Sequence, residues 1–329
     1  MRGPGKTAPF RGPDGAVLPG SIAEVAYVRL GGVDQWVMIR GTDIANPVLI
    51  ALHGGPGMPE TALLRHFNGD LEHAFTVVYW EQRGAGKSFA KSIPAASMTI
   101  DQFVRDLDDL VEHVRKRLRK DKVVILGHSW GSALGTLYAA RHPLKVAAYA
   151  GTGQIGNLQA SELASYAFVL EEAKRRGNKK AVAELTKLGP PPYTDKQMMV
   201  QRRWLARFAG TLGRLPVLTA LRIMLTAPES SLADLPGIVR GVMFSLRTLW
   251  SQVAALNLET AAPELKMPVY FLSGRQDHQV DAGVAAAYFE TLTAPAKTLV
   301  WFENSGHFAP FEEPEAFNRK MAEIAASLA

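Results

Sequence analysis

One five-residue segment, GHSWG at residues 127–131, constrains the fold of this chain more than any other. It has the form G-x-S-x-G, and it lies between a strand-like run at residues 122–126 and a run of small helix-forming residues at 132–140. A serine in a sharp turn from strand to helix has an exposed hydroxyl and a strained backbone, and flanking glycines leave room for the turn. The context predicts that Ser129 is a nucleophile. A glycine-rich turn whose serine only caps the helix is the alternative.

Short β-like runs alternate with helical runs along most of the chain, which is typical of a mostly parallel sheet. The run at residues 47–52 is almost continuously apolar, as a strand buried on both faces requires. We expect eight strands, at residues 22–30, 35–41, 47–52, 76–80, 123–126, 146–150, 269–273 and 298–302. Helices are expected at residues 99–118, 132–141, 282–291 and 314–328. The predicted fold class is α/β, with helices flanking a mostly parallel, eight-stranded sheet.

The alternation stops between residues 152 and 264, where we find no convincing strand and expect several helices. Prolines at positions 190–192 and 228 interrupt this stretch. We interpret it as a helical insertion, a lid (cap), placed over the sheet. The predicted domains are therefore a core of residues 1–151 and 265–329 and a lid of residues 152–264.

A serine hydroxyl needs a base to take its proton, and the base needs an acid to orient it. Where the nucleophile lies between a strand and a helix, the acid and then the base follow it along the chain. Asp277 comes just past the strand at residues 269–273, and His307 follows the next strand, so both lie at the carboxyl edge of the sheet. We predict that Asp277 orients His307 and that His307 is the general base for Ser129.

Three neighbouring residues are alternatives for these roles. Asp281 lies where the next helix should begin, which suits an N-cap. His278 adjoins Asp277 and would point elsewhere, and Glu303 follows the wrong strand. Asp277 and His307 therefore remain the predicted pair.

The oxyanion formed during acyl transfer needs two backbone N–H donors, each worth about 3 kcal/mol in the transition state. One is expected from Trp130, the residue after the nucleophile. The other is expected from the glycine-rich turn HGGPG at residues 53–57, and we predict the N–H of Gly55. A plain tight turn is the alternative for this segment.

Three segments together resemble the proline iminopeptidase branch of the α/β-hydrolases: HGGPG at 53–57, EQRGAGKS at 81–88 and GHSWG at 127–131. The resemblance covers the core, residues 22–151 and 268–329. It implies the α/β-hydrolase fold with a lid inserted after the sixth strand. It also implies hydrolysis through an acyl-enzyme without a cofactor.

The predicted lid departs from that family. The resemblance implies a W-x-x-W-E pattern there, whose glutamate holds the free amino group of the substrate. The nearest match, RWLARFA at residues 203–209, has Leu205 or Ala209 at the glutamate position, and a second lid glutamate cannot be placed. A milder departure is Glu81, where the family usually has aspartate. Because a buried ammonium group without a carboxylate is costly, these departures disfavour N-terminal aminoacyl substrates.

The predicted lid is instead rich in apolar side chains. Five of them are candidate substrate-binding residues: Trp204, Phe208, Met243, Phe244 and Trp250. The main hypothesis is therefore a serine hydrolase that cleaves a small, apolar ester or amide through an acyl-enzyme. Proline iminopeptidase-type release of an N-terminal residue is the alternative, and a receptor that binds its ligand without turnover is a third hypothesis.

Composition and charge bear on partners and location. The chain has no cysteine, which excludes disulfides, thiolate metal sites and a cysteine nucleophile. No apolar run approaches the roughly 18 residues that span a bilayer, and no signal-like segment opens the chain. The net charge of +6 comes largely from clusters at residues 115–120 and 174–180, which fit helix ends. We expect a cytoplasmic enzyme with a small-molecule or short-peptide substrate and with neither nucleic acid nor membrane as a partner.

Two segments resemble nucleotide-binding motifs. GTGQIG at residues 151–156 matches G-x-G-x-x-G, but no acidic residue follows at the end of a second strand about 20 residues later. Gly86-Lys87-Ser88 resembles the end of a phosphate loop, but Glu81 stands where the first glycine belongs. No cluster of histidine and carboxylate residues has the spacing of a metal site. We therefore expect no cofactor and no metal.

Overall fold

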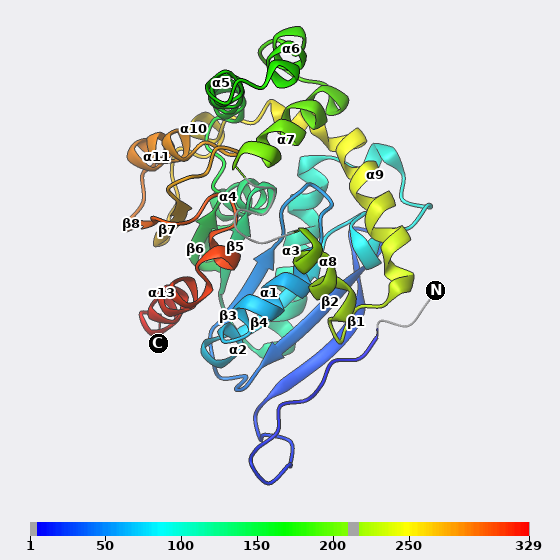
Figure 1. Cartoon of the computed structure of the whole chain (residues 1–329). Helices are drawn as coiled ribbons and strands as arrows, with labels where there is room; N and C mark the ends of the chain where they lie inside the picture. Colours follow the sequence, from blue (N-terminus) through cyan, green and yellow to red (C-terminus); the bar gives the residue numbers. More distant parts are fainter. Residues whose placement is uncertain (1–4, 210–216, 329) are drawn as a thin grey trace.

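The computed structural model describes residues 5–209 and 217–328, and its strands form one eight-stranded sheet (Figure 1). The strands are β1 (Ile22–Leu30), β2 (Val33–Gly41), β3 (Val48–Leu52), β4 (Thr76–Glu81), β5 (Val123–His128), β6 (Val146–Thr152), β7 (Val269–Gly274) and β8 (Lys297–Phe302). They lie in the order β1-β2-β4-β3-β5-β6-β7-β8. β2 is antiparallel to β1 and to β4, and the remaining neighbours are parallel. The predicted α/β class with a mostly parallel, eight-stranded sheet is confirmed.

Alternating side chains of the central strands build two separate cores. Ile50 of β3 and Ile125 of β5 belong to the first, with residues of α3 (Ile100–Leu118), α4 (Trp130–Arg141) and α11 (Ala282–Thr291). Leu49 and Val124, one residue earlier on the same strands, belong to the second. That core includes α1 (Thr61–Asn68), α2 (Leu71–Ala74), α12 (Ala309–Glu312) and α13 (Pro314–Ala326). The sheet is therefore covered on both faces, as the apolar run at residues 47–52 predicted.

Helices also make up the described part of the segment between β6 and β7. They are α5 (Leu158–Arg175), α6 (Lys179–Leu188), α7 (Asp195–Ala209), α8 (Val217–Thr226), α9 (Leu235–Ala254) and α10 (Leu258–Ala261), referred to below as the inserted helices. Between β6 and β7 the described residues contain no strand, as predicted. Figure 1 shows α5, α6 and α7 beyond the carboxyl ends of the parallel strands, whereas α8 lies beside α1.

The division of the chain into a core and a lid stays a prediction. Residues 210–216 of the predicted lid, and residues 1–4 and 329 of the predicted core, lie outside the described residues. Within the described residues, no helix is both long enough and apolar enough to cross a membrane.

Candidate active site

Ser129 occupies a strained turn between β5 and α4. Its φ of 53° and ψ of −120° lie outside the regions that side chains prefer, and such strain costs about 1–3 kcal/mol. Around this turn the main chain of neighbouring segments comes so close that no Cβ fits at the two glycine positions of the motif. A Cβ on Gly127 would lie 2.5 Å from the carbonyl oxygen of Gly131, and one on Gly131 would lie 2.1 Å from that of Leu52. Both glycines of the motif are therefore required by close packing.

His307 and Asp277 form a buried, hydrogen-bonded pair at the carboxyl edge of the sheet. Nδ1 of His307 lies 2.8 Å from Oδ2 of Asp277. The other carboxylate oxygen, Oδ1, accepts hydrogen bonds from the backbone N–H groups of Gln279 (2.9 Å) and Val280 (3.0 Å). The carboxylate is thus fixed by its own loop, and it holds the proton of His307 on Nδ1. Nε2 of His307 is buried and has no hydrogen-bond partner among the described residues.

Three loops at this sheet edge bring Ser129 toward the imidazole. The N–H of Ser129 donates to the carbonyl of Thr152, the last residue of β6, at 3.0 Å. The next residue, Gly153, lies against the ring of His307, since a Cβ there would be 2.8 Å from Cε1. The ring of His128, which precedes Ser129, has its centroid 4.9 Å from that of His307. The structure therefore joins Asp277 to His307 and places the ring of His307 beside His128, the residue before Ser129.

The alternative acids and base are engaged elsewhere. Oδ1 of Asp281 caps α11 by accepting from the N–H groups of Gly283 and Val284. The ring of His278 stacks on Phe168 with centroids 3.6 Å apart. Glu303 pairs with Arg275 at the exposed end of β8. Their placement agrees with the choice of Asp277 and His307.

A cavity of about 290 Å³ opens beside Ser129. Both predicted oxyanion donors, Gly55 and Trp130, contribute to its wall. Gly55 has a φ of 118°, which side chains rarely adopt, and Trp130 is the first residue of α4, where backbone N–H groups have no helical acceptor. Both residues lie where the sequence predicts them, and their binding of an oxyanion stays a prediction.

The inserted helices supply most of the remaining wall of the cavity. Its apolar lining includes Ile155, Leu158, Met198, Met199, Ala206, Val242, Leu246, Trp250 and Val253. Its charged lining consists of Glu162 on α5 and Arg202 on α7. A mostly apolar pocket with a few polar groups is the usual form of a small-molecule site.

Of the five predicted substrate-binding residues, Trp250 alone is among the described residues that line this cavity. Trp204 and Phe208 stack on each other, with centroids 5.7 Å apart, where α7 packs against α5 and α6. Phe244 contacts Phe89 on another side of α9, and Met243 is also absent from the lining. The structure thus places four of the five away from the cavity.

Helical periodicity explains most of this difference. On α9 the lining residues Val242, Leu246 and Trp250 are four residues apart and share one face. Phe244 is rotated by about 160° from the middle of that face, whereas Met243 lies at its edge, rotated by about 60°. Periodicity therefore explains the position of Phe244, and it does not separate Met243 from the lining residues. On α7 the lining positions are 198, 199, 202 and 206, and positions 204 and 208 lie on the opposite side, toward the neighbouring helices. Apolar composition alone does not distinguish these faces.

Sequence reasoning missed Glu162, which puts a carboxylate into the cavity wall. Glu162 is 3% exposed and is ion-paired with Arg202 through Oε1. Its other oxygen, Oε2, is buried and has no hydrogen-bond partner among the described residues. The family pattern directed attention to residues 203–209 on α7, whereas this carboxylate comes from α5. Glu162 lies four residues after Leu158, another lining residue, so both share one face of α5, but nothing in the sequence shows that this face is turned toward the cavity.

The comparisons with known proteins agree with this geometry. The family model described as the alpha/beta hydrolase fold matches residues 47–314. The chain belongs to the α/β-hydrolase family. A protein named "Probable aminopeptidase YbaC" from Bacillus subtilis is 36% identical over 303 residues, which cover 90% of this chain and 94% of that protein. This α/β hydrolase is also 23% identical, over 309 residues and 89% of each chain, to a proline iminopeptidase from Saccharolobus solfataricus.

A solved structure gives the same fold for this α/β hydrolase. The crystal structure of a proline iminopeptidase from Mycobacterium smegmatis matches with a TM-score of 0.68 at 18% identity, covering 93% of this chain and 98% of that one. The predicted membership of the proline iminopeptidase-like branch is confirmed, and the protein is a hydrolase of this enzyme family. Across residues 5–209 and 217–328, no three histidine or carboxylate side chains are grouped so as to hold a metal ion.

Proposed function

We propose that this α/β hydrolase is an aminopeptidase of the proline iminopeptidase type, which releases the N-terminal residue of short peptides. The observation that carries the proposal is Glu162, a buried carboxylate in the wall of the cavity that also holds Ser129. The sequence disfavoured this activity because no lid carboxylate could be placed, and Glu162 removes that objection. The similarity to the probable aminopeptidase of Bacillus subtilis supports the same activity.

A carboxylate oxygen without a partner among the described residues is the physical basis for the proposed role of Glu162. A substrate with a free ammonium group needs an anionic partner when it leaves water for this cavity. Oε1 of Glu162 is held by Arg202, which fixes the direction of the carboxylate, and Oε2 has no partner among the described residues. In the proposed complex, Oε2 accepts a hydrogen bond from the substrate ammonium group. The inserted helices α5, α7 and α9, which all line the cavity, act in this proposal as the lid.

The proposed reaction follows the order of proton transfers that the hydrogen bonds allow. Nε2 of His307 takes the proton of Ser129 as Oγ attacks the carbonyl carbon, while Asp277 stabilises the imidazolium formed. The N–H groups of Gly55 and Trp130 stabilise the oxyanion. His307 then protonates the leaving amine as the C–N bond breaks. His307 then deprotonates a water molecule that attacks the acyl carbon, and it returns this proton to Oγ of Ser129 as the acyl C–O bond breaks.

A substrate panel tests this proposal. It compares prolyl and alanyl arylamides with nitrophenyl esters of several chain lengths, using the wild type and Ser129→Ala. We expect aminoacyl arylamides to be the better substrates, and expect Ser129→Ala to abolish their turnover. A clear preference for apolar esters would overturn the proposal in favour of the second candidate, esterase activity, which the mostly apolar lining of the cavity supports.

A further inference from the structure

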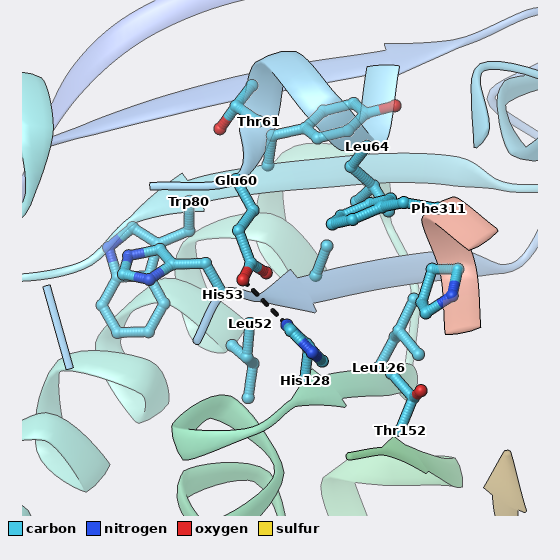
Figure 2. A pocket seen from close by; sticks show the side chains of 13 residues that line it. Leu52, His53, Glu60, Thr61, Leu64, Trp80, Leu126, His128, Thr152 and Phe311 are labelled. Atoms are coloured by element: carbon cyan, nitrogen blue, oxygen red, sulfur yellow. Dashed lines mark hydrogen bonds and ion pairs between the residues drawn. The ribbon is translucent and has the colours of Figure 1, made fainter. Parts of the chain in front are cut away.

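Next to Ser129, the side chains of His128 and Glu60 contact each other in the wall of a small pocket of about 30 Å³ (Figure 2). His128 is the last residue of β5, and Glu60 directly precedes α1. Nδ1 of His128 lies 2.8 Å from Oε1 of Glu60, and Nε2 lies 3.0 Å from the backbone carbonyl oxygen of His307. The side chain of His128, the residue before Ser129, thus contacts the backbone of His307.

The partners of the His128 ring indicate its protonation state. Both neighbours of the His128 ring are acceptors, a carboxylate and a carbonyl, and a neutral imidazole has only one N–H. Both interactions are satisfied when the ring is an imidazolium and Glu60 is ionised. A backbone hydrogen bond from Gly54 to Glu60 favours the ionised carboxylate.

The electrostatic surroundings favour the same state. Burial opposes protonation of His128, but the charge and hydrogen bond of Glu60 raise its pKa above the ordinary value. Burial is the largest influence on the Glu60 carboxyl and raises its pKa, but the charge and hydrogen bond of His128, with His53 and the backbone of Gly54, together lower that pKa below the ordinary value. The other titratable groups that influence this pair are His53 and Asp277, together with His307, whose ring is next to that of His128.

His53 in the same cavity wall provides an internal contrast. Its Nε2 accepts a hydrogen bond from the N–H of Gln82 at 3.1 Å, and its Nδ1 lies 2.8 Å from the carbonyl oxygen of Gly54. One proton, on Nδ1, satisfies both contacts, so His53 is neutral. Burial lowers its pKa, in agreement with this count. Two neighbouring buried histidines therefore differ in charge because their partners differ.

We propose that the doubly protonated His128, oriented by Glu60, is a positioning residue that holds the backbone of His307 and thereby sets the distance between the general base and Ser129. The inference rests on the roles proposed above for Ser129 and His307. The glycine-rich turn is packed against the same pair, since a Cβ on Gly54 would lie 3.0 Å from Oε1 of Glu60 and 3.2 Å from Cβ of Ser129. The pair therefore supports the nucleophile, the base and the neighbour of Gly55 together.

Loss of one proton from His128 should weaken its hold on the backbone of His307. With Glu60 ionised, a neutral His128 directs a lone pair at either the carboxylate or the carbonyl of His307, so one contact becomes repulsive. The wild type should therefore lose kcat as the pH rises through the raised pKa of His128. In Glu60→Gln, the amide can donate to Nδ1 while a neutral His128 still donates from Nε2 to His307, so this alkaline loss should disappear.

The kinetic test uses a nitrophenyl ester, so that it does not depend on amino-group recognition. Glu60→Gln should keep kcat within about threefold at neutral pH and remove the alkaline loss. His128→Phe, which keeps a ring but has no N–H, should lower kcat about tenfold or more with little change in KM. Glu81→Gln is the matched control, because Glu81 is also buried but pairs with Lys87, and it should retain the alkaline loss. The same alkaline loss in the wild type and Glu60→Gln would overturn the proposal.

A spectroscopic test is independent of any substrate. In ¹⁵N-histidine NMR of the wild type at neutral pH, His128 should carry a proton on both ring nitrogens, and His53 should carry one. Glu60→Gln should show one proton on His128. This measurement keeps the proposal testable if His128→Phe does not fold or if the aminopeptidase proposal fails. A neutral His128 in the wild type would overturn it.

Discussion

The two halves of the candidate site are held in different ways. On the sheet side, the backbone itself fixes the groups: Ser129 has a strained φ, Gly131 touches the carbonyl of Leu52, and Asp277 is held by two N–H groups of its own loop. On the side of the inserted helices, the cavity wall is made of side chains from three separate helices, with one ion pair, Glu162–Arg202. The difference fits the proposed division of labour, in which groups at the sheet edge carry out the chemistry and side chains of the inserted helices select the substrate.

The largest expected effect is on the sheet side. Ser129→Ala and His307→Ala should each lower kcat by about 10⁶-fold, and the double variant should lose no more than either, because the triad acts as a unit. Steady-state kinetics on an aminoacyl arylamide measures this. Additive losses would show that the two residues act independently.

Two glycine substitutions, one on the sheet side and one among the inserted helices, should lower the free energy of unfolding by different amounts. Gly131→Ala should destabilise the fold by about 3 kcal/mol, because its Cβ would meet the backbone of Leu52. Gly177→Ala lies between α5 and α6, at a φ of 62° that side chains rarely adopt but with open space around it, and it should cost about 1 kcal/mol. Chemical denaturation checks both values, and equal losses would contradict the contrast between a tightly packed turn and an open one.

Glu162→Gln tests selectivity on the helix side. It should raise KM for aminoacyl arylamides about tenfold, which is about 1.4 kcal/mol of binding free energy, with a smaller change in kcat. The matched control is Glu184→Gln on α6, whose carboxylate pairs with Arg203 and accepts from Trp204. It should leave KM within about twofold. Similar increases in both variants would remove the special role of Glu162.

The smallest expected effects distinguish two adjacent residues of α9. Val242→Phe should narrow the cavity and raise KM about threefold. Met243→Ala, one position along the helix and off the lining, should change KM by less than about twofold. Michaelis–Menten analysis on one arylamide is sufficient, and the reverse ranking would mean that the other face of α9 contacts substrate.

The same contrast explains what the sequence could predict. Ser129, Asp277 and His307 could be found because chain order and the ends of parallel strands determine which residues meet at the sheet edge. Gly55 could be found because a glycine-rich turn follows a buried strand. In the structure Asp277 pairs with His307, and Ser129 and Gly55 line one cavity, while their roles stay predictions.

The cavity wall could not be predicted in the same way. The inserted helices that line the cavity have apolar residues both on the face toward it and on the face toward their neighbours. The sequence alone therefore cannot show that Val242 lines the cavity and Trp204 does not. Glu162 was missed because its distance from Ser129 depends on how α5 crosses the sheet edge, which no local pattern encodes. Positions fixed by backbone geometry are therefore predictable, and positions fixed by helix packing are not.

The most direct test of the account compares prolyl arylamide with N-acetylprolyl arylamide on the wild-type enzyme. Acetylation removes the positive charge that Glu162 is proposed to bind and leaves the scissile bond unchanged. We predict that kcat/KM for the free amine exceeds that for the acetylated substrate by about 100-fold or more, since Oε2 of Glu162 would lose the ammonium donor proposed for it while Arg202 still holds Oε1. Equal values for the two substrates would contradict the account.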